Sequence, residues 1–147
     1  CSMINSIGEI TKSTAKSAVI VSNIQQEFST LTPLNSSKNV LYLIWKNPYI
    51  AVGKNTFINN MLLACGLINC LAKTRYPQLT NEEIKLLNPE IIFLSSEPYP
   101  FKEKHIDELQ ELLPNTLIIL VNGELFSWYG SRLLLAPAYF LKLLYKI

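Results

Sequence analysis

The chain has 147 residues, the size of one domain, and its 49% hydrophobic and 16% charged residues exclude a disordered polypeptide. A net charge of +2, carried by scattered lysines, is too small for a nucleic-acid-binding surface. No apolar run is long enough to span a bilayer, so the mean hydropathy of +0.21 indicates a buried core and an apolar surface that meets a partner outside this chain.

In chain order, the spacing of apolar residues predicts a first helix over residues 9–31. The run VLYLIW (40–45) is continuously apolar and rich in β-branched and aromatic residues, which is typical of a strand buried on both faces. A loop with a short extended piece near 50–52 follows. Asn55 or Thr56 then caps a helix that ends at Gly66.

The rest of the chain continues this alternation of helices and strands. The pattern predicts a short helix (81–88), a buried strand (90–96), an amphipathic helix (102–113), a third strand (116–122) and a last helix (131–145) that kinks or starts late at Pro137. Such alternation requires right-handed crossovers. We therefore expect an α/β fold, a three-layer Rossmann-like lobe with a mainly parallel sheet of about four strands flanked by helices.

Three loops, WKNPY, SSEPYPF and NGELFSWYG, follow the carboxyl ends of these strands, where ligands collect in parallel sheets. Their aromatic residues are Trp45, Tyr49, Tyr99, Phe126, Trp128 and Tyr129. Aromatic rings are costly to leave in water, so these rings either bind a large, partly flat ligand or roof the sheet. Arg132 is available for an anionic group, or it caps loop carbonyls.

The patterns that carry catalysis are missing from the sequence. The five glycines form no phosphate-binding loop, and the only aspartate, Asp107, lies in mid-helix, which excludes a phosphoryl acceptor at a strand end. The only histidine, His105, falls in a helix rich in lysine and glutamate, and we expect it to be solvated. Cys65 and Cys70 fit no zinc spacing. We expect no enzyme activity, no catalytic residue, no cofactor and no metal site.

The segment RYPQLTNEEI (75–84) places an aromatic residue stiffened by proline before an acidic helix start. With Thr80 as N-cap, Glu83 stands at the third helical position and closes a capping box. Glu82 is not needed for that box, and the positive helix end keeps it ionised. Tyr76, held out by Pro77, is a candidate wall for a ligand.

Two segments carry a resemblance to a known family. One is G-x-x-T-x-x-N-x-M-L-x-x-x-G, from Gly53 to Gly66. The other is matched by Pro77, Leu79, Thr80, Glu82, Ile84, Asn88, Pro89, Glu90 and Ile92. In order, from about Gly8 to the end, the chain resembles the C-terminal lobe of the helical-backbone substrate-binding proteins, the ABC-importer receptors for cobalamin, haem and iron–siderophore complexes.

The resemblance implies two lobes joined by one long helix, with the ligand between them. Residues 1–8 would end the connecting helix, residues 9–147 would form the C-terminal lobe, and the N-terminal lobe would be missing. The partners would be ABC permease subunits, with Glu82 docking onto permease arginines, and a metal-containing ligand. We expect the ligand-binding residues to be Trp45, Asn47, Tyr49, Tyr76, Tyr99, Glu124, Phe126, Trp128 and Arg132.

The implied location is periplasmic or membrane-anchored and extracytoplasmic, with Cys1 as either a lipid-modified residue or a fragment boundary. Two other hypotheses remain open at this stage. One is a small flavodoxin-like α/β enzyme with an unseen cofactor site, and the other is an interaction domain whose exposed aromatic residues bind another protein. Because relatives share the scaffold and vary the loops, the sequence does not identify the ligand.

Overall fold

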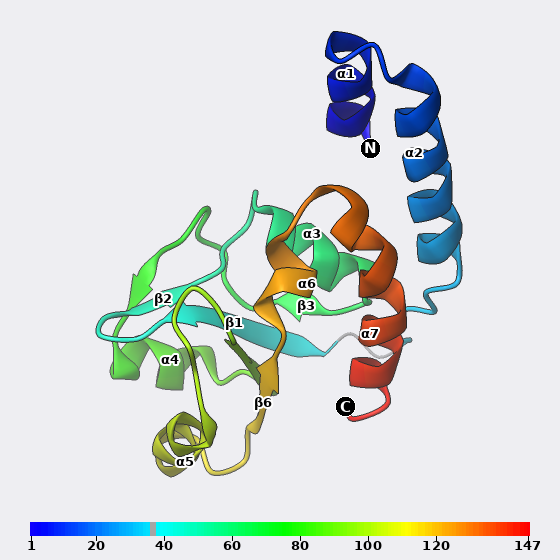
Figure 1. Cartoon of the computed structure of the whole chain (residues 1–147). Helices are drawn as coiled ribbons and strands as arrows, with labels where there is room; N and C mark the ends of the chain where they lie inside the picture. Colours follow the sequence, from blue (N-terminus) through cyan, green and yellow to red (C-terminus); the bar gives the residue numbers. More distant parts are fainter. Residues whose placement is uncertain (36–37) are drawn as a thin grey trace. The chain divides into compact units, whose positions relative to one another are not determined.

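The computed structural model describes residues 1–35 and 38–147, and it divides the chain into two compact units. The helical unit comprises Cys1–Thr32 with Trp128–Lys146, and the sheet unit comprises Pro33–Ser127 with Ile147. Figure 1 shows the helices and strands of both. Within the described residues, no helix combines the length and the apolar character that crossing a bilayer requires.

The sheet unit confirms the α/β class. Its elements are β1 (Asn39–Trp45), β2 (Tyr49–Ala51), α3 (Phe57–Ala64), β3 (Ile68–Asn69), β4 (Gln78–Leu79), α4 (Asn81–Leu87), β5 (Ile91–Ser95), α5 (Glu103–Leu112), β6 (Leu117–Val121) and α6 (Gly123–Ser127). The strand order is β4-β2-β1-β5-β6, with β3 paired to β1. Strands β1, β3, β5 and β6 pair in parallel, whereas β2 pairs antiparallel with β1 and β4.

Within residues 1–35 and 38–147 the sheet has six strands rather than about four. The four parallel strands form its core, and β2 and β4 add a short antiparallel ribbon at one edge. We expected the extended piece near 50–52, which is β2. The two-residue strands β3 and β4 are too short to show the period-2 pattern by which strands are recognised.

The sheet is covered on both faces, as its continuously apolar strands require. On one face Leu41, Leu43, Ile92 and Leu94 form a buried cluster with Ile84 of α4 and Leu109 of α5. On the other face Tyr42 and Phe93 contact the Phe126 ring of α6, with ring centroids 5.2 and 6.0 Å away. Figure 1 shows the same layers, with α4 and α5 on one side of the strands and α3 and α6 on the other.

The G-x-x-T-x-x-N segment has a structural role. The Thr56 hydroxyl accepts a hydrogen bond from the Asn59 N–H (3.1 Å) and donates to the Gly53 carbonyl (2.9 Å), which caps α3. The Asn69 side-chain amide donates to Asn59 Oδ1 (3.1 Å) and to the Val52 carbonyl (2.9 Å). These buried bonds connect the end of β2, α3 and β3 into one fixed corner.

The second family segment also contains structural residues. The Glu90 carboxylate accepts a hydrogen bond from the Asn39 N–H at the start of β1 (2.8 Å), and the Pro89 carbonyl accepts one from the Thr116 hydroxyl before β6 (2.9 Å). The turn between α4 and β5 therefore aligns the amino ends of three neighbouring strands.

In the helical unit, the prediction of a single helix over residues 9–31 is wrong at its start, because two helices cover this part of the chain. The unit contains α1 (Ser2–Ile10), α2 (Thr14–Ser29), a 3₁₀ helix η1 (Gly130–Leu135) and α7 (Ala136–Leu144). The chain turns at Lys12, which has a positive φ of 54°, in a polar TKST stretch whose side chains favour caps and turns over helix interiors. At the other end, Pro137 lies in the first turn of α7, so the late start is correct.

Candidate functional site

The carboxyl ends of β1, β5 and β6 lie at one edge of the sheet unit, because the three strands are parallel and in register. Leu43 is opposite Leu94, and Ser95 is opposite Val121. The loops that follow therefore leave from the same edge, as the sequence predicted. We define the carboxyl edge as the loops 46–48, 96–102 and residue 122, with the strand-end residue Trp45.

Trp45 and Tyr99 are brought together at this edge. Their ring centroids are 5.6 Å apart at an interplanar angle of 66°, an edge-to-face contact. The Tyr99 backbone N–H donates to the Ile44 carbonyl (3.3 Å), which holds the second loop against the end of β1. Trp45 remains 40% exposed, so part of this aromatic pair is open to solvent.

Phe126 is placed differently from our expectation. It is fully buried, and its ring packs on Tyr42 and Phe93, so it covers one face of the sheet. For this residue the roof interpretation is correct. Its loop was expected to be irregular, but residues Gly123–Ser127 form α6, which carries Phe126 inward.

The loop after β6 lies close to the loop after β5. A Cβ on Gly123 would be 2.3 Å from Ser95 Oγ, so only glycine permits this approach. The Ser127 hydroxyl donates to the Glu97 carboxylate (3.0 Å), a second link between the two loops. Glu124 is half-buried beside them, and its N–H donates to Asn122 Oδ1 (3.0 Å).

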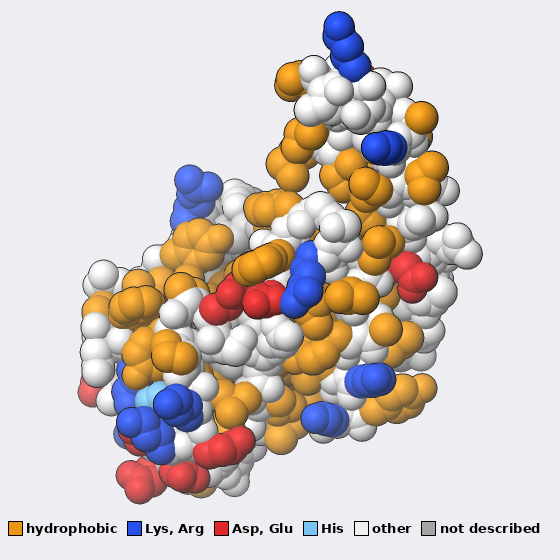
Figure 2. Space-filling model, in the orientation of Figure 1, with side chains coloured by type: hydrophobic (Ala, Val, Ile, Leu, Met, Phe, Trp, Pro, Cys, Tyr) orange, Lys and Arg blue, Asp and Glu red, His pale blue; other side chains and the backbone are white. Residues whose placement is uncertain are grey.

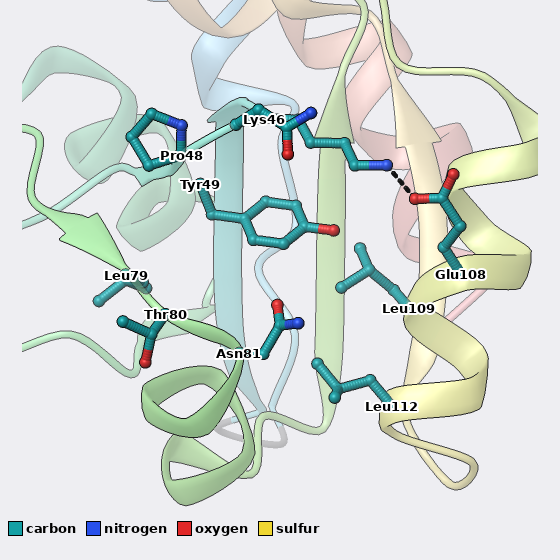
Figure 3. Close-up of a pocket in the computed structure, with 10 residues that line it drawn as sticks. Lys46, Pro48, Tyr49, Leu79, Thr80, Asn81, Glu108, Leu109 and Leu112 are labelled. Atoms are coloured by element: carbon teal, nitrogen blue, oxygen red, sulfur yellow. Dashed lines mark hydrogen bonds and ion pairs between the residues drawn. The ribbon is translucent and has the colours of Figure 1, made fainter.

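Asn47 and Tyr49 line a pocket of about 410 Å³ between the β1–β2 turn, the start of α4 and α5. Figure 3 shows the Tyr49 ring in the middle of this pocket, above Asn81 and facing Leu109. Burial raises the pKa of the Tyr49 hydroxyl. Asn47 is exposed at the pocket rim, so these two predicted residues border a different hollow from the surface formed by Trp45 and Tyr99.

Lys46 and Glu108 form an ion pair across the same pocket. Burial is the largest single influence on the pKa of Lys46 and lowers it, but the hydrogen bond to Glu108 and the charges of Tyr49, Glu108 and Tyr99 together raise the pKa above its ordinary value. The same bond lowers the pKa of Glu108. This pair connects the loop after β1 to α5 and was not foreseen, since nothing in the spacing of residues 46 and 108 indicates that they meet.

Tyr76 is 48% exposed on a loop whose backbone is held firmly. The Gly53 N–H donates to the Arg75 carbonyl (2.7 Å), and the Arg75 N–H donates to the Lys54 carbonyl (2.9 Å). A Cβ on Gly53 would lie 2.3 Å from the Lys73 carbonyl oxygen, so the close approach requires glycine. The ring of Tyr76 is thus presented to solvent by a rigid backbone.

The start of α4 has the predicted capping box. The Glu83 N–H donates to the Thr80 hydroxyl (3.2 Å), and the Thr80 N–H donates to the Glu83 carboxylate (2.9 Å). Glu83 also pairs with Lys73 (3.0 Å). Glu82 is exposed, and hydrogen bonds to its own backbone N–H and to Thr80 lower its pKa, so its carboxylate is charged at neutral pH.

Trp128 and Arg132 belong to the helical unit and contact each other. The Arg132 guanidinium lies over the Trp128 ring, 5.8 Å from its centroid, which is cation–π geometry. Both side chains are exposed, as is Tyr129. Together they form a second aromatic surface with a positive charge attached.

The expectation that His105 is solvated is wrong, because the side chain is buried. It is 3% exposed. Its Nδ1 accepts a hydrogen bond from the Lys102 N–H (2.8 Å), and its Nε2 is 3.3 Å from the Tyr99 hydroxyl. The polar neighbours of His105 in the sequence suggested an outward side chain. Its position three residues after Lys102 is the one signal that could have indicated an inward, capping role.

Among the described residues, no three His, Cys, Asp or Glu side chains gather as metal ligands would. At the carboxyl edge of the sheet unit the described groups are aromatic rings, amides and a few charges, which are groups that ligand-binding surfaces use.

The sequence matches the periplasmic binding protein family over residues 1–115, and the chain belongs to this family. A comparison with curated proteins gives no significant match. The family match favours a binding protein over the flavodoxin-like enzyme considered above.

Solved structures share the fold. A possible iron-binding (periplasmic solute-binding) protein from Staphylococcus epidermidis is 20% identical with a TM-score of 0.76, covering 92% of this chain and 57% of that one. The periplasmic haem-binding protein HutB of Vibrio cholerae is 20% identical with a TM-score of 0.76, covering 96% and 61%. The periplasmic vitamin B12-binding protein BtuF of Vibrio cholerae is 19% identical with a TM-score of 0.59, covering 93% and 55%. The chain spans less than two thirds of each of these structures.

Proposed function

We propose that this chain is the C-terminal lobe of an extracytoplasmic receptor that binds a metal-containing ligand and delivers it to an ABC permease. The ligand class is haem, cobalamin or a ferric siderophore. The observation that carries the proposal is the aromatic pair of the exposed Trp45 and the half-buried Tyr99 at the carboxyl edge of a periplasmic-binding-protein sheet. Structural relatives support it: they include a haem-binding protein, a vitamin B12-binding protein and an Fe³⁺-hydroxamate transport protein.

In this proposal Trp45, Tyr99 and Tyr76 of the sheet unit supply aromatic walls. Asn47, Tyr49 and Glu124 of the same unit supply polar contacts. Trp128 and Arg132 stay predictions from the sequence, as a further ring and as a positive charge for an anionic group. Phe126 is buried, so its role is to pack against the strands and support the residues that they carry. Flat macrocycles bury large apolar areas against such rings. Each Å² of apolar surface removed from water contributes about 25 cal/mol to the free energy of binding.

The missing partners follow from the same proposal. A second lobe would close the ligand site, with residues 1–8 ending a helix between the lobes and residues 9–147 forming this lobe. The receptor would work outside the cytoplasm, either periplasmic or membrane-anchored. It would perform no chemistry on its cargo. Glu82, exposed and charged at the start of α4, would dock onto arginines of the permease.

The test is a spectral titration of the full-length protein, with both lobes, against haemin, cyanocobalamin and a ferric hydroxamate siderophore. We expect saturable binding of one of the three. Replacing Trp45 with alanine should weaken that binding at least tenfold, whereas Leu63→Ala, an exposed apolar change on α3, should not. No saturable binding of any of the three would contradict the proposal.

A further inference from the structure

Four rings form a continuous row from the core to the carboxyl edge. Tyr99 is at its centre, with ring centroids 5.6 Å from Trp45, 4.7 Å from Phe101 and 5.5 Å from His105. Phe101 and His105 are also in contact, at 5.5 Å and 88°. Phe101 and His105 are buried, Tyr99 is half-buried and Trp45 is exposed. The two buried rings therefore support Tyr99, and Tyr99 in turn supports Trp45.

The hydrogen bonds of His105 assign its protonation state. Nδ1 accepts from the Lys102 N–H, so Nδ1 carries no proton and the ring hydrogen is on Nε2. Nε2–H then faces the Tyr99 hydroxyl oxygen at 3.3 Å. The neutral imidazole thus has two tasks, capping α5 at its third residue and bracing Tyr99.

The charges around His105 come from each element packed on it. Burial lowers its pKa most, and Lys46 after β1, together with Lys102 and Lys104 at the start of α5, lowers it further, while Glu108 acts in the opposite sense. Figure 2 shows Lys and Arg side chains crowded around the histidine side chain. These surroundings favour the neutral ring at neutral pH.

We propose that His105 is a positioning residue for the candidate ligand surface: its neutral ring holds Tyr99, and through Tyr99 it holds Trp45, so that acidification loosens this surface. A proton added at Nδ1 would place an N–H opposite the Lys102 N–H and remove the bond between them. The imidazolium would also be buried beside three lysines. This inference rests on the proposed function only in taking Trp45 and Tyr99 as ligand contacts.

The experiment uses Trp45 fluorescence in the 147-residue chain that carries Trp128→Phe, in which Trp45 is the only tryptophan of the chain. Because the chain has one histidine, no other side chain titrates near neutrality at its ordinary pKa. As the pH falls from 7.5 we expect a reversible one-proton step in Trp45 emission, with a midpoint below the ordinary histidine pKa of about 6.5.

His105→Gln is the decisive variant. Glutamine at the third helical position still accepts a bond from the Lys102 N–H, so α5 remains capped, but it neither titrates nor fills the row of rings. The step should be lost while the far-ultraviolet circular dichroism is unchanged. Lys102→Ala is the matched control, since only its backbone N–H contacts the ring; it should keep the step and move the midpoint upward.

A flat emission profile in the folded Trp128→Phe protein, or the same step in His105→Gln, would overturn the proposal. Should His105→Gln fail to fold, the parent and Lys102→Ala titrations still decide it. With haemin as the probe at pH 7.5, His105→Gln should bind about three- to tenfold more weakly in full-length protein that keeps Trp128, since the edge-to-face support of Trp45 is lost. If haemin does not bind even the unmodified protein, the proposed function fails for haem, whereas the fluorescence step still tests the positioning role.

Discussion

Glu108 provides the sharpest residue-scale test of electrostatics, because its bond to Lys46 lowers its pKa below the unfolded value. A carboxylate with a lowered pKa in the folded protein stabilises it above the unfolded pKa, about 4.3, and this contribution is lost as pH falls through the folded pKa. Most of the stabilising effect is therefore present at pH 7 and absent at strongly acidic pH.

We expect Glu108→Gln to lower the melting temperature at pH 7 by a few degrees and to have a smaller effect near pH 3, as measured by thermal denaturation followed by circular dichroism. Glu111→Gln, an exposed change on the same helix, should be neutral at both pH values. An equal loss at both pH values would mean that the ion pair contributes nothing and that glutamine disturbs packing instead.

At the scale of elements, the buried strands and the cap of α4 could be predicted from the sequence, because each is a local pattern. VLYLIW, EIIFLSS and TLIILVN contain β1, β5 and β6 within one or two residues at each end. The Thr80–Glu83 box needed only the spacing of two residues. In these segments, local preference and tertiary burial favour the same structure.

The rest of the site depends on contacts between distant residues, which a single sequence does not reveal. The burial of His105 follows from its contact with Tyr99, and the pairing of Lys46 with Glu108 joins residues 62 positions apart. Phe126 points inward because it lies in α6, a helix that occupies a segment for which we expected an irregular loop. Aromatic composition located the carboxyl edge but could not separate the rings that support it from those that line it.

Asn69 is the element-scale test of the fixed corner that joins β2, α3 and β3. Asn69→Ala would leave the Val52 carbonyl, Asn59 Oδ1 and the Leu71 N–H without their present partner. Because these groups are buried, we expect a loss of roughly 2–3 kcal/mol in the free energy of unfolding, measured by urea denaturation. Asn60→Ala, exposed on α3, is the control and should change it by less than about 0.5 kcal/mol. A loss below about 1 kcal/mol for Asn69→Ala would show that water replaces these bonds.

At the scale of the whole molecule, substitutions of Glu82 and Glu83 distinguish the proposed role in transport from a role in folding. In the full-length receptor, Glu82→Ala should reduce permease-dependent uptake by about tenfold and leave ligand affinity unchanged, because in the proposed docking role its charge acts on the permease and not on the ligand. Glu83→Ala removes the acceptor of the Thr80 N–H and the partner of Lys73, so it should lower the melting temperature without a comparable loss of uptake. The opposite pattern in the uptake assay would show that the two roles are reversed.

Strand β6 has a consequence for the behaviour of the protein at high concentration. Among the described strands it pairs with β5 on one side only, and its sequence LIILV contains no charge. An uncharged edge of this kind can add a strand from another molecule and begin aggregation. Leu117 is 41% exposed, so a charge there need not enter the core. We expect Leu117→Lys to slow the growth of light scattering at elevated temperature while leaving the melting temperature within about 2 °C; unchanged scattering would show that self-association uses another surface.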